Sequence, residues 1–518
     1  MRSVPSRALA AGFVLAVAGV GAWQFLPSAT GTGDAIKVGT TDVASSLDPA
    51  GAYDAGSWAL FSNVYQSLMT IRPGSADPVP DAADSCKFIG QKLTTYECGV
   101  RDGLKFANGR EVTAEDVKHS FDRIKAINSD QGPAPLFNTL KSISVHGRTV
   151  TFNLNTRDAT FPFKIATGAA SIVDRESYPA DRLREGDRAD GSGPYVLNSF
   201  TAGSEVRLEP NDAYLGEADS PHAPVTIRYF KNSEELNAAW QDRKIDVAHR
   251  DLPPEVLAGL RPGLADTRYQ QSGGTETRSM VFNVRKGSPM ADRSVRQAVA
   301  AVLDRSKIAS GPYQGTVTPL YSLVPQGVGS HSTPFFDTYP QPDAAEAKKL
   351  LRDAGVNTPV SFTLGLNVRG TNISEAAEIK RQLESTGLFK VKTESVDEWP
   401  EFQKAYAAGR FDAYTIGWIA DFPDPDNFIA PLVGADSSMN NGFQDEAIDR
   451  LITRTQSFSD RSLAATDFRE LQQLVAEEAP MLPIWQKKDF VVSRDAVTGG
   501  QFLSDGTGVW RLWELNWL

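Results

Sequence analysis

The stretch "VRDGLKFANGREVTAEDVKHSFDRI", from Val100 to Ile124, predicts an amphipathic helix that begins at a defined cap. Thr113 and Asp116 have the spacing of a capping box, in which two side chains satisfy backbone N–H groups at the helix start. Apolar residues follow at helical spacing: Val117, Phe121 and Ile124. We therefore expect this helix to pack on a core through one face.

Strand-like runs and helical patterns alternate outward from this segment. The strand-like runs are "AIKVGT", "TVTFNL", "APVTIRYF" and "SMVFNV". The helical patterns include "DRSVRQAVAAVLDRSKIA" from Asp292, "DAAEAKKLLRDAG" from Asp343 to Gly355, and "SEAAEIKRQLESTG" ending at Gly387. This alternation predicts an α/β fold, most clearly in the second half of the chain.

The composition is that of a large globular protein. A chain of 518 residues is too long for one core, so we expect two or more lobes. The net charge is −11, and no run rich in lysine and arginine occurs, which argues against a nucleic-acid partner. We read the acidic balance mainly as a source of solubility.

The N-terminus has the pattern of an export signal. Arg2 and Arg7 precede a nearly uncharged stretch from Ala8 to Leu26. We expect residues 1–33 to be a signal peptide, cleaved near residues 29–33, or a retained membrane anchor. No cysteine follows the apolar run, so lipoprotein processing is not expected. The body would act outside the cytoplasm, in the periplasm or at the extracellular face of the cytoplasmic membrane.

Two cysteines, Cys86 and Cys98, flank a glycine-containing segment that resembles a hairpin. Exported proteins retain disulfides, so we expect these two residues to form one. Two thiolates with no nearby histidine do not make a zinc site.

Signals of catalysis are mostly absent from the sequence. It has no G-x-S-x-G nucleophile elbow, no H-E-x-x-H zinc motif and no Gly-Lys pair of a phosphate-binding loop. We therefore expect a protein that is not an enzyme and needs no cofactor or metal. A carboxylate pair formed by distant residues, as in glycosidases, is the alternative left open.

The stretch "GWIADFPDPDNF", from Gly417 to Phe428, holds three aspartates. An EF-hand loop that starts at Asp421 or at Asp424 does not place the required ligands. Asp424 and Asp426 stand beside prolines, as turn-forming or capping residues do. Asp421 follows the apolar strand-like run "YTIGW", and ligands of open α/β sheets bind at the carboxyl ends of strands. A partly dry carboxylate beside Trp418 would attract an ammonium group, and a surface turn is the alternative.

Six blocks in order resemble the bacterial extracellular solute-binding proteins of family 5, the dipeptide- and oligopeptide-binding components of ABC importers. The blocks are residues 46–68, 100–124, 191–216, 282–308, 343–355 and 417–429. The resemblance implies a two-lobe periplasmic-binding-protein-like fold of type II, similar to cluster C, with a hinge of crossing strands. Lobe I would comprise residues 34–283, with an extra subdomain at about 56–185, and the C-terminal return 487–518. Lobe II would comprise residues 284–486.

The resemblance also implies a ligand site between the lobes. Asp421 matches the aspartate that holds a peptide's α-ammonium group, and Arg369 resembles the arginine that holds the C-terminal carboxylate. Trp399 and Trp418 match aromatic positions of the pocket. From the residues alone, Arg369 could equally be a surface arginine, and each tryptophan could be a core residue.

The expected function is therefore capture of short peptides by a monomer that delivers them to ABC permease subunits. Two alternatives stay open. The same fold could bind an oligosaccharide, a metal chelate, haem or an opine, or the chain could be a secreted hydrolase.

Overall fold

The computed structural model describes residues 34–75, 77–504 and 506–518. The predicted signal peptide or anchor, residues 1–33, lies outside this range. Within the described residues, no helix is both long and apolar enough to cross a membrane.

One mixed sheet runs through the whole molecule. Its strands are, in spatial order, β15 (Phe389–Val396), β14 (Val360–Asn367), β16 (Ala413–Trp418), β12 (Arg268–Phe282), β17 (Met481–Ser493), β11 (Val247–His249), β1 (Ile36–Thr40), β10 (Val225–Tyr229), β9 (Glu205–Pro210) and β8 (Tyr195–Thr201). The short strand β13 (Val317–Pro319) also pairs with β17. Strand β1 pairs in parallel with β10 and β11, and β14 pairs in parallel with β15 and β16.

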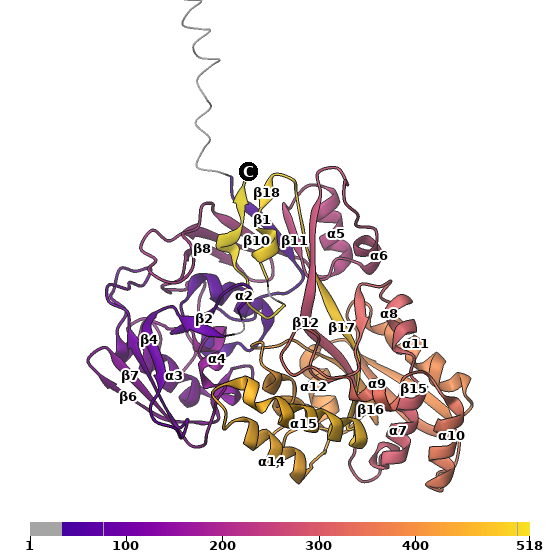
Figure 1. Cartoon of the computed structure of the whole chain (residues 1–518). Helices are drawn as coiled ribbons and strands as arrows, with labels where there is room; N and C mark the ends of the chain where they lie inside the picture. The colour runs from indigo at the N-terminus through magenta and orange to yellow at the C-terminus, as the bar shows by residue number, and fades with distance from the viewer. Residues whose placement is uncertain (1–33, 76, 505) are drawn as a thin grey trace, which may run out of the picture.

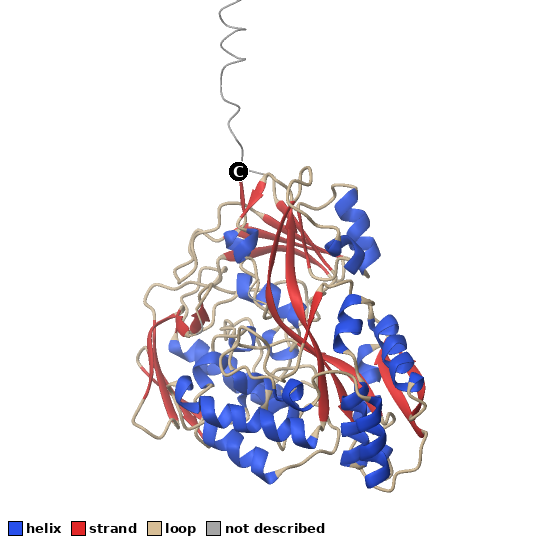
Figure 2. Cartoon of the chain, turned by 45° about the vertical axis from the view of Figure 1, so that its right-hand side comes forward, coloured by secondary structure: helices blue, strands red, loops and turns tan. Residues whose placement is uncertain are grey.

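The long strands β12 and β17 connect the two ends of this sheet. They pair antiparallel from Arg268 opposite Ser493 to Val281 opposite Met481. The C-terminal end of β17 also pairs with β11. The C-terminal end of β12 also pairs with β16. In Figures 1 and 2 they run from the upper sheet into the helix-covered lower half. The regular register breaks between Gly273 and Thr277, at the middle of this connection.

The buried hydrophobic residues form three clusters, two on one side of the connection and one on the other. We call lobe I the part whose core is formed by residues 36–252 and 491–515, and lobe II the part whose core is formed by residues 280–485. The chain thus leaves lobe I through β12 and returns to it through β17. The two-lobe α/β fold is confirmed. The predicted boundaries at residues 283/284 and 486/487 fall beside or within the two long strands, and they stay predictions.

Helices cover the sheet in both lobes (Figure 2). Those of lobe I are α2 (Ala55–Val64), α3 (Ala114–Ile127), α4 (Phe161–Lys164), α5 (Ser233–Gln241) and α6 (Pro254–Ala258). Those of lobe II are α7 (Arg293–Val302), α8 (Arg305–Ser310), α9 (Pro334–Thr338), α10 (Ala344–Asp353), α11 (Asn372–Ser385), α12 (Trp399–Ala407), α13 (Ala430–Val433), α14 (Glu446–Thr455) and α15 (Ala465–Glu478).

The helix predicted from Thr113 is α3. Thr113 is its N-cap and forms the capping box with Asp116. Its buried face includes Val117, Phe121 and Ile124. The helical pattern from Asp292 is divided into α7 and α8, because the chain is extended at Leu303 and Asp304 caps the second helix through Lys307 N–H.

A separate four-stranded sheet stands beside α3 in lobe I. Its order is β4 (Ala83–Phe88), β5 (Thr95–Val100), β7 (Thr149–Leu154) and β6 (Leu140–His146). Cys86 and Cys98 lie directly opposite each other on β4 and β5 and form a disulfide. The remaining two-stranded sheets are β2 (Met69–Ile71) with β3 (Pro78–Pro80), and β18 (Val497–Thr498) with β19 (Asn516–Trp517).

The C-terminal segment completes lobe I beside the first strand (Figure 1). The Trp517 indole donates a hydrogen bond of 2.7 Å to the carbonyl of Asp34. Trp510, Leu512 and Leu515 are buried in the lobe I core. The return predicted for residues 487–518 therefore joins the N-terminal strand in one lobe.

Candidate functional site

Asp421 lies where the two lobes meet. It follows β16 of lobe II, and its side chain is only 8% exposed. One carboxylate oxygen, Oδ2, accepts hydrogen bonds from the Tyr53 hydroxyl at 2.7 Å and from Asn427 Nδ2 at 2.8 Å. Tyr53 belongs to lobe I, just after the short 3-10 helix η1 (Pro49–Gly51). The carboxylate is therefore held jointly by both lobes.

Further contacts between the lobes surround Asp421. The next residue, Phe422, packs against Phe163 of lobe I with 5.7 Å between ring centroids. The backbone N–H of Ala159 donates to the carbonyl of Gln456 at 3.3 Å. The first contact packs the segment after β16 against lobe I, and the second joins the end of α14 to lobe I.

The Asp421 carboxylate has no ion-pair partner among the described residues. Burial raises its pKa to about 6, although the hydrogen bonds from Asn427 and Tyr53 and the more distant charge of Lys164 act in the opposite direction. Lys164 is itself paired with Asp158 at 2.8 Å. A buried carboxylate that lacks a cation is costly to keep ionised, so a ligand ammonium group would relieve that cost.

The other two aspartates of the stretch have structural contacts. Asp424 caps the 3-10 helix η5 (Pro425–Phe428) and pairs through both oxygens with Arg461 at 2.7 and 3.0 Å. Asp426 lies in the first turn of η5 and is buried. Asp424 thus acts as the capping residue that the sequence predicts.

Arg369 reaches the lobe boundary at a different place. It lies in the loop between β14 and α11, and its side chain is 60% exposed. Its Nη2 atom lies 3.3 Å from the Thr41 carbonyl oxygen and 3.6 Å from Asp42 Oδ1, both in lobe I. No contact joins Arg369 to Asp421 among the described residues, so the two predicted anchors stand apart.

A group of charged residues lies at the irregular middle of the long strands. Lys487 of β17 pairs with Asp251 at 2.8 Å and with Glu276 of β12 at 3.2 Å. Burial opposes the charge of Lys487, but the two carboxylates raise its pKa above the usual value. Arg250 pairs with Asp42 at 3.1 Å. Sequence reasoning missed this group because its members are far apart in the chain.

The two predicted tryptophans differ in their surroundings. Trp418 is half-buried at the end of β16, opposite Thr277 of β12. Its indole N–H is buried and has no hydrogen-bond partner in the described part of the chain. Trp399, at the start of α12, is 45% exposed and packs against Phe402 at 5.9 Å. Of the two, only Trp418 is a near neighbour of Asp421 in the chain, because it ends β16 three residues before Asp421.

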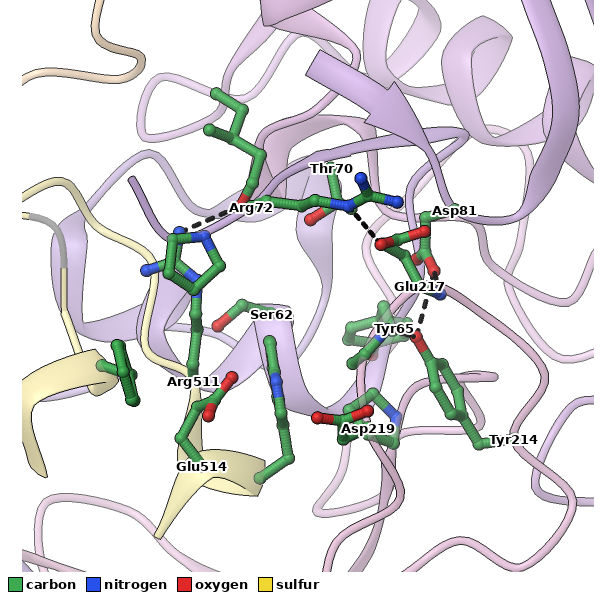
Figure 3. A pocket seen from close by; sticks show the side chains of 16 residues that line it. Ser62, Tyr65, Thr70, Arg72, Asp81, Tyr214, Glu217, Asp219, Arg511 and Glu514 are labelled. Atoms are coloured by element: carbon green, nitrogen blue, oxygen red, sulfur yellow. Dashed lines mark hydrogen bonds and ion pairs between the residues drawn. The ribbon is translucent and has the colours of Figure 1, made fainter. Parts of the chain in front are cut away.

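The larger of two described cavities lies within lobe I, away from all of these residues. It measures about 400 Å³ and is lined by segments that include Tyr65, Asp81, Tyr214 and Arg511 (Figure 3). The Tyr214 hydroxyl donates to Asp81 at 3.0 Å. None of the predicted site residues lines this cavity. Elsewhere in the described ranges, no group of three or more His, Cys, Asp or Glu side chains is arranged to hold a metal.

Two α/β lobes joined by two long strands, with a buried carboxylate at their meeting point, define a two-lobe solute-binding protein. The chain belongs to the bacterial extracellular solute-binding proteins of family 5. The model described as "Bacterial extracellular solute-binding proteins, family 5 Middle" matches residues 77–440. Members of this family are exported binding proteins.

Known proteins resemble the chain over most of its length. It is 27% identical to heme-binding protein A of Haemophilus influenzae, over 86% of this chain and 85% of that protein. It is 26% identical to di/tripeptide-binding protein 3 of Pseudomonas aeruginosa, over 83% of this chain and 85% of that protein. The fold matches an ABC transporter-associated periplasmic binding protein of Helicobacter pylori in complex with the peptide STSA. That match has a TM-score of 0.80 and 21% identity, and it covers 93% of this chain and 98% of the other.

Proposed function

We propose that this protein captures short peptides between its lobes and delivers them to the membrane permease of an ABC importer. The observation that carries the proposal is the Asp421 carboxylate, which is buried at the lobe boundary without a protein cation among the described residues. A peptide supplies such a cation in its α-ammonium group. The related di/tripeptide-binding protein supports the same ligand class.

The remaining predicted residues take complementary roles in this proposal. Arg369 holds the C-terminal carboxylate of the peptide. Trp418 and Trp399 form apolar walls for peptide side chains, and Trp418 can also donate its indole N–H. Charge pairs at the two ends would fix the ligand, while the walls tolerate different side chains.

Binding is coupled to movement of the lobes. Residues 34–283 with 487–518 and residues 284–486 would move as two bodies about the irregular middle of β12 and β17. Closure around the ligand is the usual motion of two-lobe binding proteins. The protein would act as an exported monomer without catalysis, held at the cell surface or free in the periplasm, and residues 1–33 would direct its export or anchor it.

A second ligand class deserves a direct comparison because one relative is named a heme-binding protein. Haem lacks an α-ammonium group, so Asp421 would have no partner in such a complex. Oligosaccharides and metal chelates leave the same carboxylate without its cation. A hydrolytic role is less favoured than peptide capture, since no nucleophile motif is present in the sequence.

Calorimetry with Ala-Ala-Ala and N-acetyl-Ala-Ala-Ala tests the proposal. The free tripeptide should bind at least 100-fold more tightly, because acetylation removes the ammonium charge that Asp421 requires. Equal affinities would contradict the anchor. Binding of haem but of neither peptide would contradict peptide capture, and intact peptide after prolonged incubation would count against hydrolysis.

A further inference from the structure

Arg369 already has a carboxylate beside it, supplied by the protein. Asp42 of lobe I follows β1, and its Oδ1 atom lies 3.6 Å from Arg369 Nη2 of lobe II. The same Nη2 atom donates to the Thr41 carbonyl at 3.3 Å. The guanidinium that the proposed function assigns to the ligand carboxylate is thus engaged by lobe I.

Asp42 is fixed much more firmly than Arg369. Its side chain is 15% exposed, and it pairs at 3.1 Å with Arg250 Nη1. Arg250 is buried and is held in turn by a hydrogen bond of 2.7 Å from Nη2 to the Thr507 carbonyl. Arg369, by contrast, is mostly exposed and belongs to a loop. Asp42 is therefore the more buried and more firmly paired of the two residues.

A second acidic group adds to the negative field around Arg369. Asp251 accepts a hydrogen bond of 3.1 Å from the Thr41 hydroxyl and pairs with Lys487. The charge of Lys487, opposed by burial and supported by Arg369 and Arg250, holds the pKa of Asp251 well below its usual range. Asp251 forms no ion pair with Arg369 among the described residues, so Asp42 is the carboxylate that contacts the guanidinium.

A ligand carboxylate that approaches Arg369 must share or replace the contact with Asp42. Exposed ion pairs are weak and readily exchanged, so a ligand carboxylate can replace Asp42 beside Arg369. The Asp42 charge, which Arg250 holds in place, stays nearby and repels the incoming carboxylate. We propose that Asp42 is a specificity-determining residue that competes with the ligand's carboxylate for Arg369. It thereby disfavours ligands with a free carboxylate at that end relative to ligands that are neutral there. This inference rests on the proposed function.

The test compares Ala-Ala-Ala with Ala-Ala-Ala amide, which share the ammonium group and differ in the C-terminal charge. The measured quantity is the ratio of the amide Kd to the free-acid Kd, obtained by calorimetry at low salt. Asp42→Asn should raise this ratio about three- to ten-fold, mainly through tighter binding of the acid. Arg369→Ala should bring the ratio to one or below, because the Asp42 charge still repels the free acid. When Arg369 has already been replaced by alanine, adding Asp42→Asn should raise this Kd ratio less than it does in the otherwise unaltered protein.

Asp84→Asn is the matched control, because it removes a lobe I carboxylate that pairs with the exposed Arg148 at 3.0 Å. It should leave the ratio unchanged. Thermal unfolding verifies that each variant is folded, and the Arg369→Ala ratio supplies an independent measurement should Asp42→Asn not fold.

The outcomes separate the inference from the proposed function. An unchanged ratio in Asp42→Asn, with both peptides still binding, overturns the inference alone. An equal loss of affinity for both peptides also overturns it, because Asp42 would then serve only to join the lobes. Failure of both peptides to bind the unaltered protein contradicts the proposed function and removes the inference with it.

Discussion

Tyr53 of lobe I donates a hydrogen bond of 2.7 Å to Asp421 of lobe II, across 368 residues of sequence. The Tyr53 ring also packs against Trp58 of α2, with 5.3 Å between ring centroids. The proposed ammonium anchor is thus supported by the opposite lobe, so the geometry of the anchor depends on how the lobes are placed.

Replacing Asp421 by alanine should weaken binding of Ala-Ala-Ala by about 10²–10³-fold or more. The ligand ammonium would then be buried without its counter-charge, which typically costs about 3–5 kcal/mol. Calorimetry at pH 7 measures the change. Asp436→Ala, at an exposed residue of the same lobe, is the control, and an Asp421 variant that binds like the unaltered protein would refute the anchor.

Peptide affinity should fall as the pH is lowered through 6. The pKa of Asp421 in the ligand-free protein is about 6, because burial disfavours its charged form. At pH 5 about a tenth of the molecules would carry the charge that binds ammonium, so Kd should rise roughly tenfold relative to pH 7. A Kd that stays constant from pH 7 to pH 5 would show that the ionised carboxylate is not required.

The same raised pKa makes Asp421 a cost to stability at neutral pH. The folded protein holds this proton up to about pH 6, whereas the unfolded chain releases it near the ordinary aspartate pKa of 3.8. Stability from this group is therefore greatest below the unfolded pKa and declines as pH rises from about 4 to 6. Asp421→Asn should stabilise the ligand-free protein by about 1–2 kcal/mol at pH 7, measured by urea unfolding. A stability difference that does not vary with pH would contradict this account.

Removing the Tyr53 hydroxyl should weaken binding of Ala-Ala-Ala roughly ten- to hundred-fold. Hydrogen bonds to charged groups contribute about 1.5–3 kcal/mol, and this one favours the ionised carboxylate. Tyr53→Phe should also move the pH midpoint of binding upward. Tyr214→Phe is a matched control, since it removes a tyrosine–aspartate hydrogen bond of 3.0 Å to Asp81 in the lobe I cavity (Figure 3). Equal effects of the two variants on affinity would argue against a specific role for Tyr53.

Arg123→Ala should destabilise the protein by about 3–5 kcal/mol. Arg123 and Asp48 form a two-bond ion pair at 2.6 and 2.8 Å, and both side chains are buried, so truncation leaves an uncompensated charge. Urea unfolding measures the change. Arg148→Ala, at an exposed pair, should cost less than about 1 kcal/mol. A loss for Arg123→Ala as small as for the control would mean that Asp48 finds other partners.

Patterns among neighbouring residues were sufficient to predict helices and strands, but not which of these elements meet across long stretches of sequence. The capping box at Thr113 and the apolar spacing of α3 depend on neighbouring residues, so the helix was predictable. Asp421 was singled out by its place just beyond a strand-like run and, more strongly, by its match to the family's motif. The break between α7 and α8 was missed, since the apolar spacing continues through Leu303 while the backbone does not.

The contacts that build the site have no local signal in the sequence. Tyr53 meets Asp421, and Asp42 meets Arg369, only because β12 and β17 bring the lobes together. The exposure of Trp399 depends on how α12 lies on its lobe. Each of these depends on the tertiary arrangement, which periodicity does not encode.

The order of residues in the chain also determines which lobe core can be completed first as the chain is synthesised. The core of lobe II is finished once residue 485 has been made, whereas lobe I waits for Trp510, Leu512 and Leu515. The Trp510 carbonyl accepts hydrogen bonds from Ser62 and Asn63, residues made nearly four hundred and fifty positions earlier. Lobe I therefore cannot reach its final packing until the segment that contains these three residues has been made. A chain that has been made only as far as residue 485 can thus complete the core of lobe II but not the core of lobe I.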